Sequence, residues 1–201
     1  MKLFHSQTSP FVRKVMVTAL ELGLADRLER LPAAAHPVNR DAAIVVQNPL
    51  GQVPTLLLDD GTVLADSRVI CEYLDHLGQG GLFPPAGPAR WAALAAQSAG
   101  DGLLDAALLV VYETRVRAET ERSAAWVAGQ HAKIESALQR IEAAAAGFGS
   151  RLDIGTITYA CALGYLDLRF ADLDWRARFP AAAAWFAGFD ARPSMQATKP
   201  A

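Results

Sequence analysis

Residues 48–67 read Asn-Pro-Leu-Gly-Gln-Val-Pro-Thr-Leu-Leu-Leu-Asp-Asp-Gly-Thr-Val-Leu-Ala-Asp-Ser, and this stretch decides the fold. Its apolar runs, 55–58 and 62–65, predict two short strands joined by Asp59-Asp60-Gly61. Aspartate followed by glycine between hydrophobic runs indicates a hairpin, because the central turn positions then tolerate a positive φ. We therefore expect an antiparallel pair of strands at one edge of a sheet.

Polar and backbone groups flank this hairpin on both sides. Val53-Pro54 precedes the first strand, and an X-Pro bond is the one peptide bond at which the cis form is cheap. Asp66 and Ser67 follow the second strand and open a helix, so a carboxylate and a hydroxyl lie at a helix N-terminus. The arrangement suits a small zwitterionic ligand. It equally suits a loop that ends at a proline and a simply capped helix, and the stretch alone leaves both interpretations open.

The composition sets the class of protein. The chain has 201 residues, of which 52% are hydrophobic and 20% charged, as in a globular protein of one large or two small domains. A net charge of −2 argues against a basic surface for nucleic acid or for an anionic membrane. Cys71 and Cys161 lie far apart, without the spacing of a metal or redox motif. We expect a cytoplasmic protein with no signal peptide, no membrane span and no bound metal.

The first part of the chain alternates strand and helix patterns. Residues 2–6 and 27–32 predict strands, and a helix between them begins after Ser9, a good N-cap, with Pro10 in its first turn. Residues 39–47 have weak helical character, and 67–77 form an amphipathic helix. This order predicts a small mixed α/β sheet, with a parallel crossover and the antiparallel hairpin.

The second part of the chain is helical. Residues 79–87 are dense in glycine and proline and predict a linker between a domain at 1–78 and another at 88–201. Residues 89–146 predict two long helices that break near 119–123. Ser150-Arg-Leu-Asp153 has the form of a capping box that opens an apolar helix reaching Phe170. The last predicted helix covers 180–189.

Short motifs spread over nearly the whole chain point to one family. They are Thr8-Ser-Pro-Phe-Val-Arg-Lys14, the segment 48–56, Asp66-Ser67 with Ile70-Cys-Glu-Tyr-Leu74, Ser150-x-x-Asp153, and the ending Phe179-Pro to Arg192-Pro. In order and separation they resemble the cytosolic glutathione transferases, most closely the bacterial members with a Ser-Pro-Phe-Val-Arg-Lys segment. The resemblance implies a thioredoxin-like N-terminal domain that binds glutathione as co-substrate. It also implies an all-α C-terminal domain that lines the pocket for an electrophile, and a homodimer.

The resemblance also implies a glutathione site. Val53 would pair its backbone with the cysteinyl part of glutathione, with a cis Pro54 turning that backbone outward. Asp66 would offset the α-amino group of the γ-glutamyl end, while Ser67 and the helix N–H groups would receive its carboxylate. Gln52 would reach the glycyl carboxylate. Asp153 would serve folding, as a buried cap.

Ser9 occupies the position at which this family places a side chain facing the glutathione sulfur. A serine there would donate a hydrogen bond to the thiolate, assisted by the positive end of the first helix, and it can be an N-cap at the same time. Since no cysteine stands there, conjugation to a small hydrophobic electrophile is favoured over thiol–disulfide chemistry. The alternatives are a glutathione-dependent isomerase or dehalogenase, and a non-catalytic glutathione-binding protein of the same fold.

Arg13 lies one helical turn after Ser9 and admits two interpretations. It could shape the electric field near the sulfur, or it could be a solvated or ion-paired residue of the helix surface. The isomerase alternative would need basic residues in the pocket, and only Arg13 and Arg115 offer themselves from the sequence.

Overall fold

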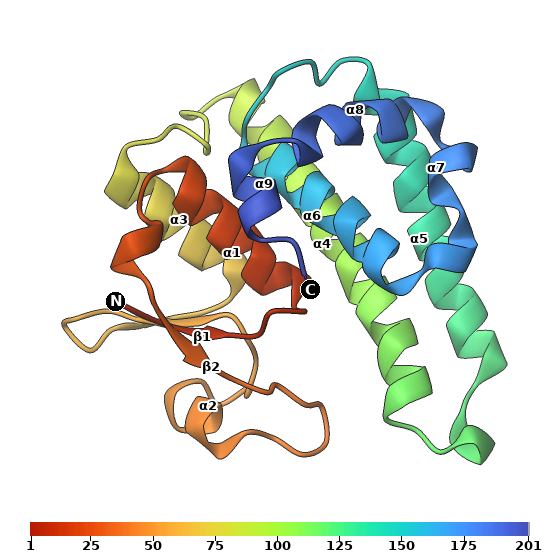
Figure 1. Ribbon diagram of the computed structural model, residues 1–201, viewed down its shortest axis with the longest axis horizontal. Helices are drawn as coiled ribbons and strands as arrows, with labels where there is room; N and C mark the ends of the chain where they lie inside the picture. Colours follow the sequence, from red (N-terminus) through yellow and green to blue (C-terminus); the bar gives the residue numbers. More distant parts are fainter. Residues whose placement is uncertain (201) are drawn as a thin grey trace. The chain divides into compact units, whose positions relative to one another are not determined.

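The computed structural model describes residues 1–200, and its contacts divide the chain into two compact units (Figure 1). One unit is Met1–Gly87 together with the residues from Pro193 onward, and the other is Pro88–Arg192. The predicted helical domain, 88–201, included these C-terminal residues. They belong with the first unit because helix α9 (Pro193–Ala197), which the sequence did not reveal, packs on the first helix of the chain.

The first unit is a four-stranded mixed sheet with helices, as predicted. Its elements are β1 (Lys2–His5), α1 (Pro10–Glu21), β2 (Glu29–Pro32), α2 (Ala42–Gln47), β3 (Thr55–Leu57), β4 (Val63–Leu64) and α3 (Ser67–Gly78). The strand order is β2-β1-β3-β4, with β1 and β2 parallel and the other two pairs antiparallel. Helices α1 and α3 contact each other on one side of the sheet, and α2 lies on the other (Figure 1).

The turn between β3 and β4 differs in detail from the prediction. Of its residues only Gly61 has a positive φ, at 88°, and neither Asp59 nor Asp60 needs one. The amide of Gly61 donates to the carbonyl of Leu58, and the amide of Leu58 donates to the carbonyl of Thr62. This pattern is a three-residue hairpin loop in which glycine occupies the single left-handed position.

The second unit is helical throughout. It contains α4 (Pro88–Arg115), α5 (Ala124–Ala145), α6 (Ile154–Arg169), α7 (Trp175–Arg178) and α8 (Pro180–Asp190). Helix α4 packs against both α5 and α6, and α6 is buried on all sides from Ile154 to Leu166. The predicted break between the two long helices is present, with a short 3-10 turn at Glu119–Glu121.

Helix α4 is long and apolar enough, by length and composition alone, to cross a membrane, which the sequence analysis did not anticipate. Half of its most apolar window is buried inside the protein, as in the core helix of a soluble fold. This single helix is therefore weak support for a membrane span.

The start of α6 corrects the predicted capping box. Asp153, not Ser150, is the N-cap, because its carboxylate accepts from the amide of Thr156 at 2.8 Å. The hydroxyl of Thr156 in turn accepts from the amide of Asp153 at 3.0 Å. Asp153 is buried and Ser150 is exposed, so Asp153 has the buried capping role that the resemblance implied.

Two glycines bring α4 and α6 into close contact. A Cβ added at Gly100 would lie 2.8 Å from the methyl carbon of Thr158. A Cβ added at Gly155 would lie 2.6 Å from the Cβ of Ala96 and 2.9 Å from the carbonyl oxygen of Ala93. Gly155, near the start of α6, meets Ala93 and Ala96, and Gly100 meets Thr158 further along α6, so the two helices run in the same direction.

We predict that Gly155→Ala destabilises the protein, because the new methyl group would collide with backbone as well as side-chain atoms. The free energy of unfolding should fall by about 1–3 kcal/mol, measured by urea titration. Gly102→Ala is the matched control on α4, since a Cβ there meets nothing within 4 Å. It should raise the stability by about 0.5–1 kcal/mol, because alanine is the better helix former. Equal effects of the two changes would contradict this account.

Candidate functional site

The strand register places the segments that carry the predicted site residues at one end of the sheet's strands. Phe4, near the end of β1, pairs with Thr55 at the start of antiparallel β3, and Leu56 pairs with Leu64 at the end of β4. The turn after β1 leads to Ser9, the start of β3 follows Pro54, and the end of β4 leads to Asp66. The sheet topology therefore brings three segments that are far apart in the sequence to the same end of the sheet.

The loop before β3 is held by buried hydrogen bonds around Asn48 and Thr55. The amide nitrogen of the Asn48 side chain donates to the hydroxyl of Thr55 at 2.9 Å, and that hydroxyl donates to the carbonyl of Gln52 at 2.8 Å. The side-chain oxygen of Asn48 accepts from the amide of Leu50 at 3.1 Å. Asn48 is 6% exposed and Thr55 is fully buried, so these bonds fix the path of the loop.

The Val53-Pro54 peptide bond is cis, which confirms that prediction. Within residues 1–200 the backbone N–H and C=O of Val53 have no hydrogen-bond partner. Val53 is half-buried, and the side chain of Gln52 is exposed beside it. A backbone donor and acceptor are thus available just before β3, as the pairing of an extended peptide requires.

Asp66 caps α3, and its carboxylate is engaged by its neighbours. The carboxylate accepts from the amide of Arg68 at 2.8 Å and forms a forked ion pair with the guanidinium of Arg68, whose shortest distance is 2.7 Å. Burial acts to raise the pKa of Asp66, but the hydrogen bonds and charge of Arg68 and the charge of Lys14 together lower it. Asp66 is therefore ionised at neutral pH. Ser67, the next residue, is only 2% exposed.

Ser9 is the N-cap of α1, as predicted. Its hydroxyl accepts from the amide of Val12 at 3.3 Å, and its own amide donates to the carbonyl of Ser6 at 3.1 Å. The hydroxyl is half-buried and keeps its hydrogen for a second partner. Accepting from the helix and donating to another group are compatible roles.

Arg13 is buried, so it is not a solvated residue of the helix surface. Its guanidinium donates to the carbonyl of Met195 at 3.1 Å and to the hydroxyl of Thr198 at 3.4 Å. On the same helix Glu21 accepts from the hydroxyl of Ser194. Arg13 thus ties α9 to α1. These contacts give Arg13 a role in the fold of the first unit.

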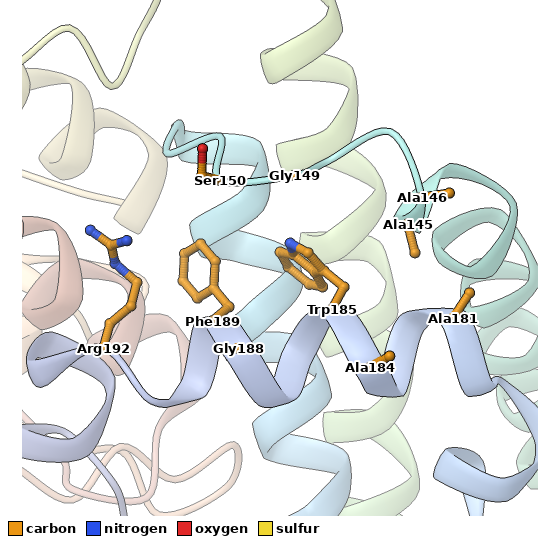
Figure 2. A pocket seen from close by; sticks show the side chains of 10 residues that line it. All are labelled: Ala145, Ala146, Gly149, Ser150, Ala181, Ala184, Trp185, Gly188, Phe189 and Arg192. Carbon is orange, nitrogen blue, oxygen red and sulfur yellow. The ribbon is translucent and has the colours of Figure 1, made fainter.

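The second unit has an open pocket of about 640 Å³ between the end of α5, the turn before α6 and α8 (Figure 2). Trp185 and Phe189 form its aromatic wall, and Arg192 lies at one end. The remaining lining residues are Ala145, Ala146, Gly149, Ser150, Ala181, Ala184 and Gly188. None of the predicted site residues lines this pocket. Over the described part of the chain, no group of three or more His, Cys, Asp and Glu residues could hold a metal ion.

Sequence reasoning missed four residues that shape the sheet-edge site. Arg68 pairs with Asp66, fully buried Lys14 acts on Asp66 through its charge, and Asn48 and Thr55 hold the loop. The two-residue spacing of Asp66 and Arg68 at the start of a helix could have indicated their ion pair. The burial of Lys14 has no signal in the sequence.

Comparisons with known proteins agree with the fold. The family model described as glutathione S-transferase, N-terminal domain, matches residues 8–77, and that of the C-terminal domain matches residues 124–188. A relative from Escherichia coli (strain K12), an uncharacterized GST-like protein called YibF, is 31% identical over 205 residues, which span 100% of this chain and 98% of the relative.

Solved structures extend the likeness over the whole chain. A glutathione transferase family member from Pseudomonas fluorescens Pf-5 with bound glutathione is 47% identical, with a TM-score of 0.97 over 100% of this chain and 98% of that one. A structure from the same organism with bound S-(propanoic acid)-glutathione is 45% identical, with a TM-score of 0.92 over 100% and 99%. One from Methylobacillus flagellatus KT with bound glutathione is 34% identical, with a TM-score of 0.90 over 100% and 99%. The chain belongs to the glutathione S-transferase family.

We predict that Asn48→Ala lowers the free energy of unfolding by about 1–3 kcal/mol, because it leaves buried polar groups without partners. Thermal and urea unfolding would measure the change. Asn39→Ala is the matched control, since Asn39 is exposed and its side chain forms no hydrogen bond with residues 1–200. A loss of stability no larger than that of the control would show that the Asn48 network does not hold the loop.

Proposed function

We propose that the protein is a glutathione transferase that ionises the glutathione thiol for attack on a small hydrophobic electrophile. The observation that carries the proposal is the strand register, which leads three segments with complementary groups to the same end of the sheet. They are the unpaired backbone of Val53, the ionised carboxylate of Asp66 and the capping hydroxyl of Ser9. Family membership and relatives solved with bound glutathione support it.

Glutathione would bind across this end of the sheet, from its γ-glutamyl group at Asp66 to its sulfur at Ser9. The α-amino group would join Arg68 in pairing with Asp66, and the α-carboxylate would lie at the N-terminus of α3, beside Ser67. The N–H and C=O of Val53, turned outward next to Pro54, would pair with the cysteinyl backbone. Gln52, exposed at the same edge, would reach the glycyl carboxylate.

At the sulfur, Ser9 would donate its hydroxyl hydrogen to the thiolate. The bond favours the ionised form over the thiol, and the N-terminus of α1 adds a partial positive charge in the same place. Each unit by which the thiol pKa falls corresponds to about 1.4 kcal/mol of differential stabilisation. Ser9 forms no covalent bond in this mechanism, because the nucleophile is the sulfur.

The thiolate electron pair would form a carbon–sulfur bond with the electrophile. The displaced electron pair then leaves with a halide-like group or, in an addition, takes a proton from solvent. The relative with bound S-(propanoic acid)-glutathione supports this reaction type, since that ligand is a thioether of glutathione. Cys71 and Cys161 are both fully buried, which does not favour disulfide exchange.

The remaining parts of the proposal follow the family. Residues 1–78 would bind glutathione, and the predicted helical domain, 88–201, would contribute to the electrophile pocket through its residues 88–192, joined by the linker 79–87. The residues from Pro193 onward pack on the first unit instead. The active form would be a cytoplasmic homodimer without a metal ion, serving detoxification.

We predict that Ser9→Ala lowers kcat by about tenfold or more, while the Kd for glutathione changes little. The thiol pKa of bound glutathione should rise by about one unit, which reduces the thiolate fraction tenfold below that pKa. Thiolate absorbance across a pH titration of the complex would measure it. The lost cap costs about 1 kcal/mol of stability, so unfolding is measured alongside. Ser9→Thr should restore activity, and Thr8→Ala, at an exposed neighbour, should leave it intact. An unchanged kcat in Ser9→Ala would refute the role of Ser9.

We predict that Asp66→Asn weakens glutathione binding about tenfold or more, because it removes the charge that offsets the α-amino group. Isothermal titration would measure the Kd, with Asp26→Asn as the exposed control on the same unit. The lowered pKa of Asp66 keeps the carboxylate ionised as pH falls through the ordinary carboxyl range. Binding should therefore persist through that range and be lost only below it. Loss of affinity at a higher pH would contradict the assignment.

A further inference from the structure

Helices α1 and α3 of the first unit lie side by side (Figure 1). The hydroxyl of Thr18 donates to the sulfur of Cys71 at 3.4 Å, which fixes one point of contact between them. Further along both helices, a Cβ added at Gly78 would lie 3.2 Å from the Cβ of Leu22. Because the contacts advance along both helices in the same sense, the two helices run in the same direction.

This register places Lys14 beside the start of α3. Lys14 precedes Thr18 by one helical turn, so the two side chains lie on the same face of α1. Ser67 precedes Cys71 by one turn of α3 in the same way. Lys14 is fully buried and Ser67 is 2% exposed, so both side chains are enclosed by the protein.

The environment of Asp66, the N-cap of α3, agrees with this placement. Burial acts to raise the pKa of Asp66, whereas the hydrogen bonds and charge of Arg68 and then the charge of Lys14 lower it. Within residues 1–200 the carboxylate forms an ion pair only with Arg68. Lys14 therefore acts on the start of α3 through space rather than by contact.

The hydroxyl of Ser67 indicates that a ligand binds at this helix start. Although Ser67 is almost completely buried, its hydroxyl has no hydrogen-bond partner within residues 1–200. A buried hydroxyl without a partner costs free energy, which an acceptor on a ligand recovers. The partial positive charge of the N-terminus of α3 favours an anionic acceptor such as a carboxylate.

Two anions meet here when the γ-glutamyl end of glutathione binds in the proposed way. One is the carboxylate of Asp66, and the other is the α-carboxylate of the ligand. The N-terminus of α3 contributes only about half a positive charge. Arg68 is exposed and already paired with Asp66. The charge of Lys14 is buried, so solvent and salt screen it less than they screen an exposed cation.

We propose that the buried ammonium group of Lys14 balances the charge of the γ-glutamyl α-carboxylate and thereby makes the site selective for ligands that carry it. Lys14 is a positioning residue, because it acts through the electric field at the start of α3 and does not touch the ligand. The inference rests on the proposed glutathione function and adds a specificity-determining residue to it.

The test separates the α-carboxylate from the rest of the ligand. Isothermal titration gives the Kd of glutathione and of 4-aminobutyryl-cysteinylglycine, in which a hydrogen replaces the α-carboxylate. Glutaryl-cysteinylglycine is the matched second analogue, since it keeps the carboxylate and lacks the α-amino group. Lys14→Met should weaken binding of glutathione and of the glutaryl analogue about tenfold, and change the Kd of the 4-aminobutyryl analogue less than about twofold.

Further variants separate charge from packing. Lys14→Gln is a second neutral variant and should give the same pattern, and urea unfolding identifies which neutral variants are folded. Lys14→Arg keeps the charge and should retain most of the affinity for glutathione. Lys2→Met is the matched control, because Lys2 is an exposed lysine of the same unit, 3.9 Å from Glu29. It should leave all three Kd values unchanged.

Two results would overturn the inference alone. One is an equal loss of affinity for glutathione and for the 4-aminobutyryl analogue in the neutral variants, which is the pattern of a packing role. The other is an unchanged Kd for glutathione in a folded neutral variant. Absence of glutathione binding by the unmodified protein would overturn the proposed function and this inference together.

Discussion

The buried hydrogen bonds between Asn48, Thr55 and the carbonyl of Gln52 are the constraint on which the candidate site depends. They join the loop to the first residue of β3, so the residues between them follow one path. That path leaves the backbone of Val53 unpaired beside a cis proline. A loop held only by exposed contacts would not keep a free donor and acceptor in place, because each freed residue gains conformational entropy of about 1–2 kcal/mol.

Charged side chains have different roles in the two units. At the sheet edge the carboxylate of Asp66 is kept ionised by Arg68 and Lys14, in spite of the burial that opposes it. In the second unit, Asp167 of α6 accepts from the indole of Trp175 and pairs with Arg176, so its charge joins α6 to α7. Arg13 shows that a basic residue near a candidate site need not serve it. Its donors go to the backbone of α9, where they stabilise the fold.

The helical unit depends on small residues more than on charge. Gly100 and Gly155 allow α4 and α6 to approach until backbone and methyl groups touch, which buries α6 on all sides. A packing requirement in the core therefore sets how closely the two helices approach.

The sequence by itself determined the features whose causes are local. Ser9 and Pro10 mark the start of α1, the Gly61 turn marks the hairpin, and the Gly/Pro-rich segment marks the end of the sheet unit, because capping, turn geometry and backbone stiffness act over a few residues. The mixed sheet and the cis Val53-Pro54 bond followed from such signals together with the family resemblance. Only the tertiary structure decided that Asp153 rather than Ser150 caps α6, and that Arg13 is buried under α9. It alone placed Lys14 where its charge acts on Asp66. Burial and charge pairing depend on residues distant in the sequence, and no short pattern specifies which of them will meet.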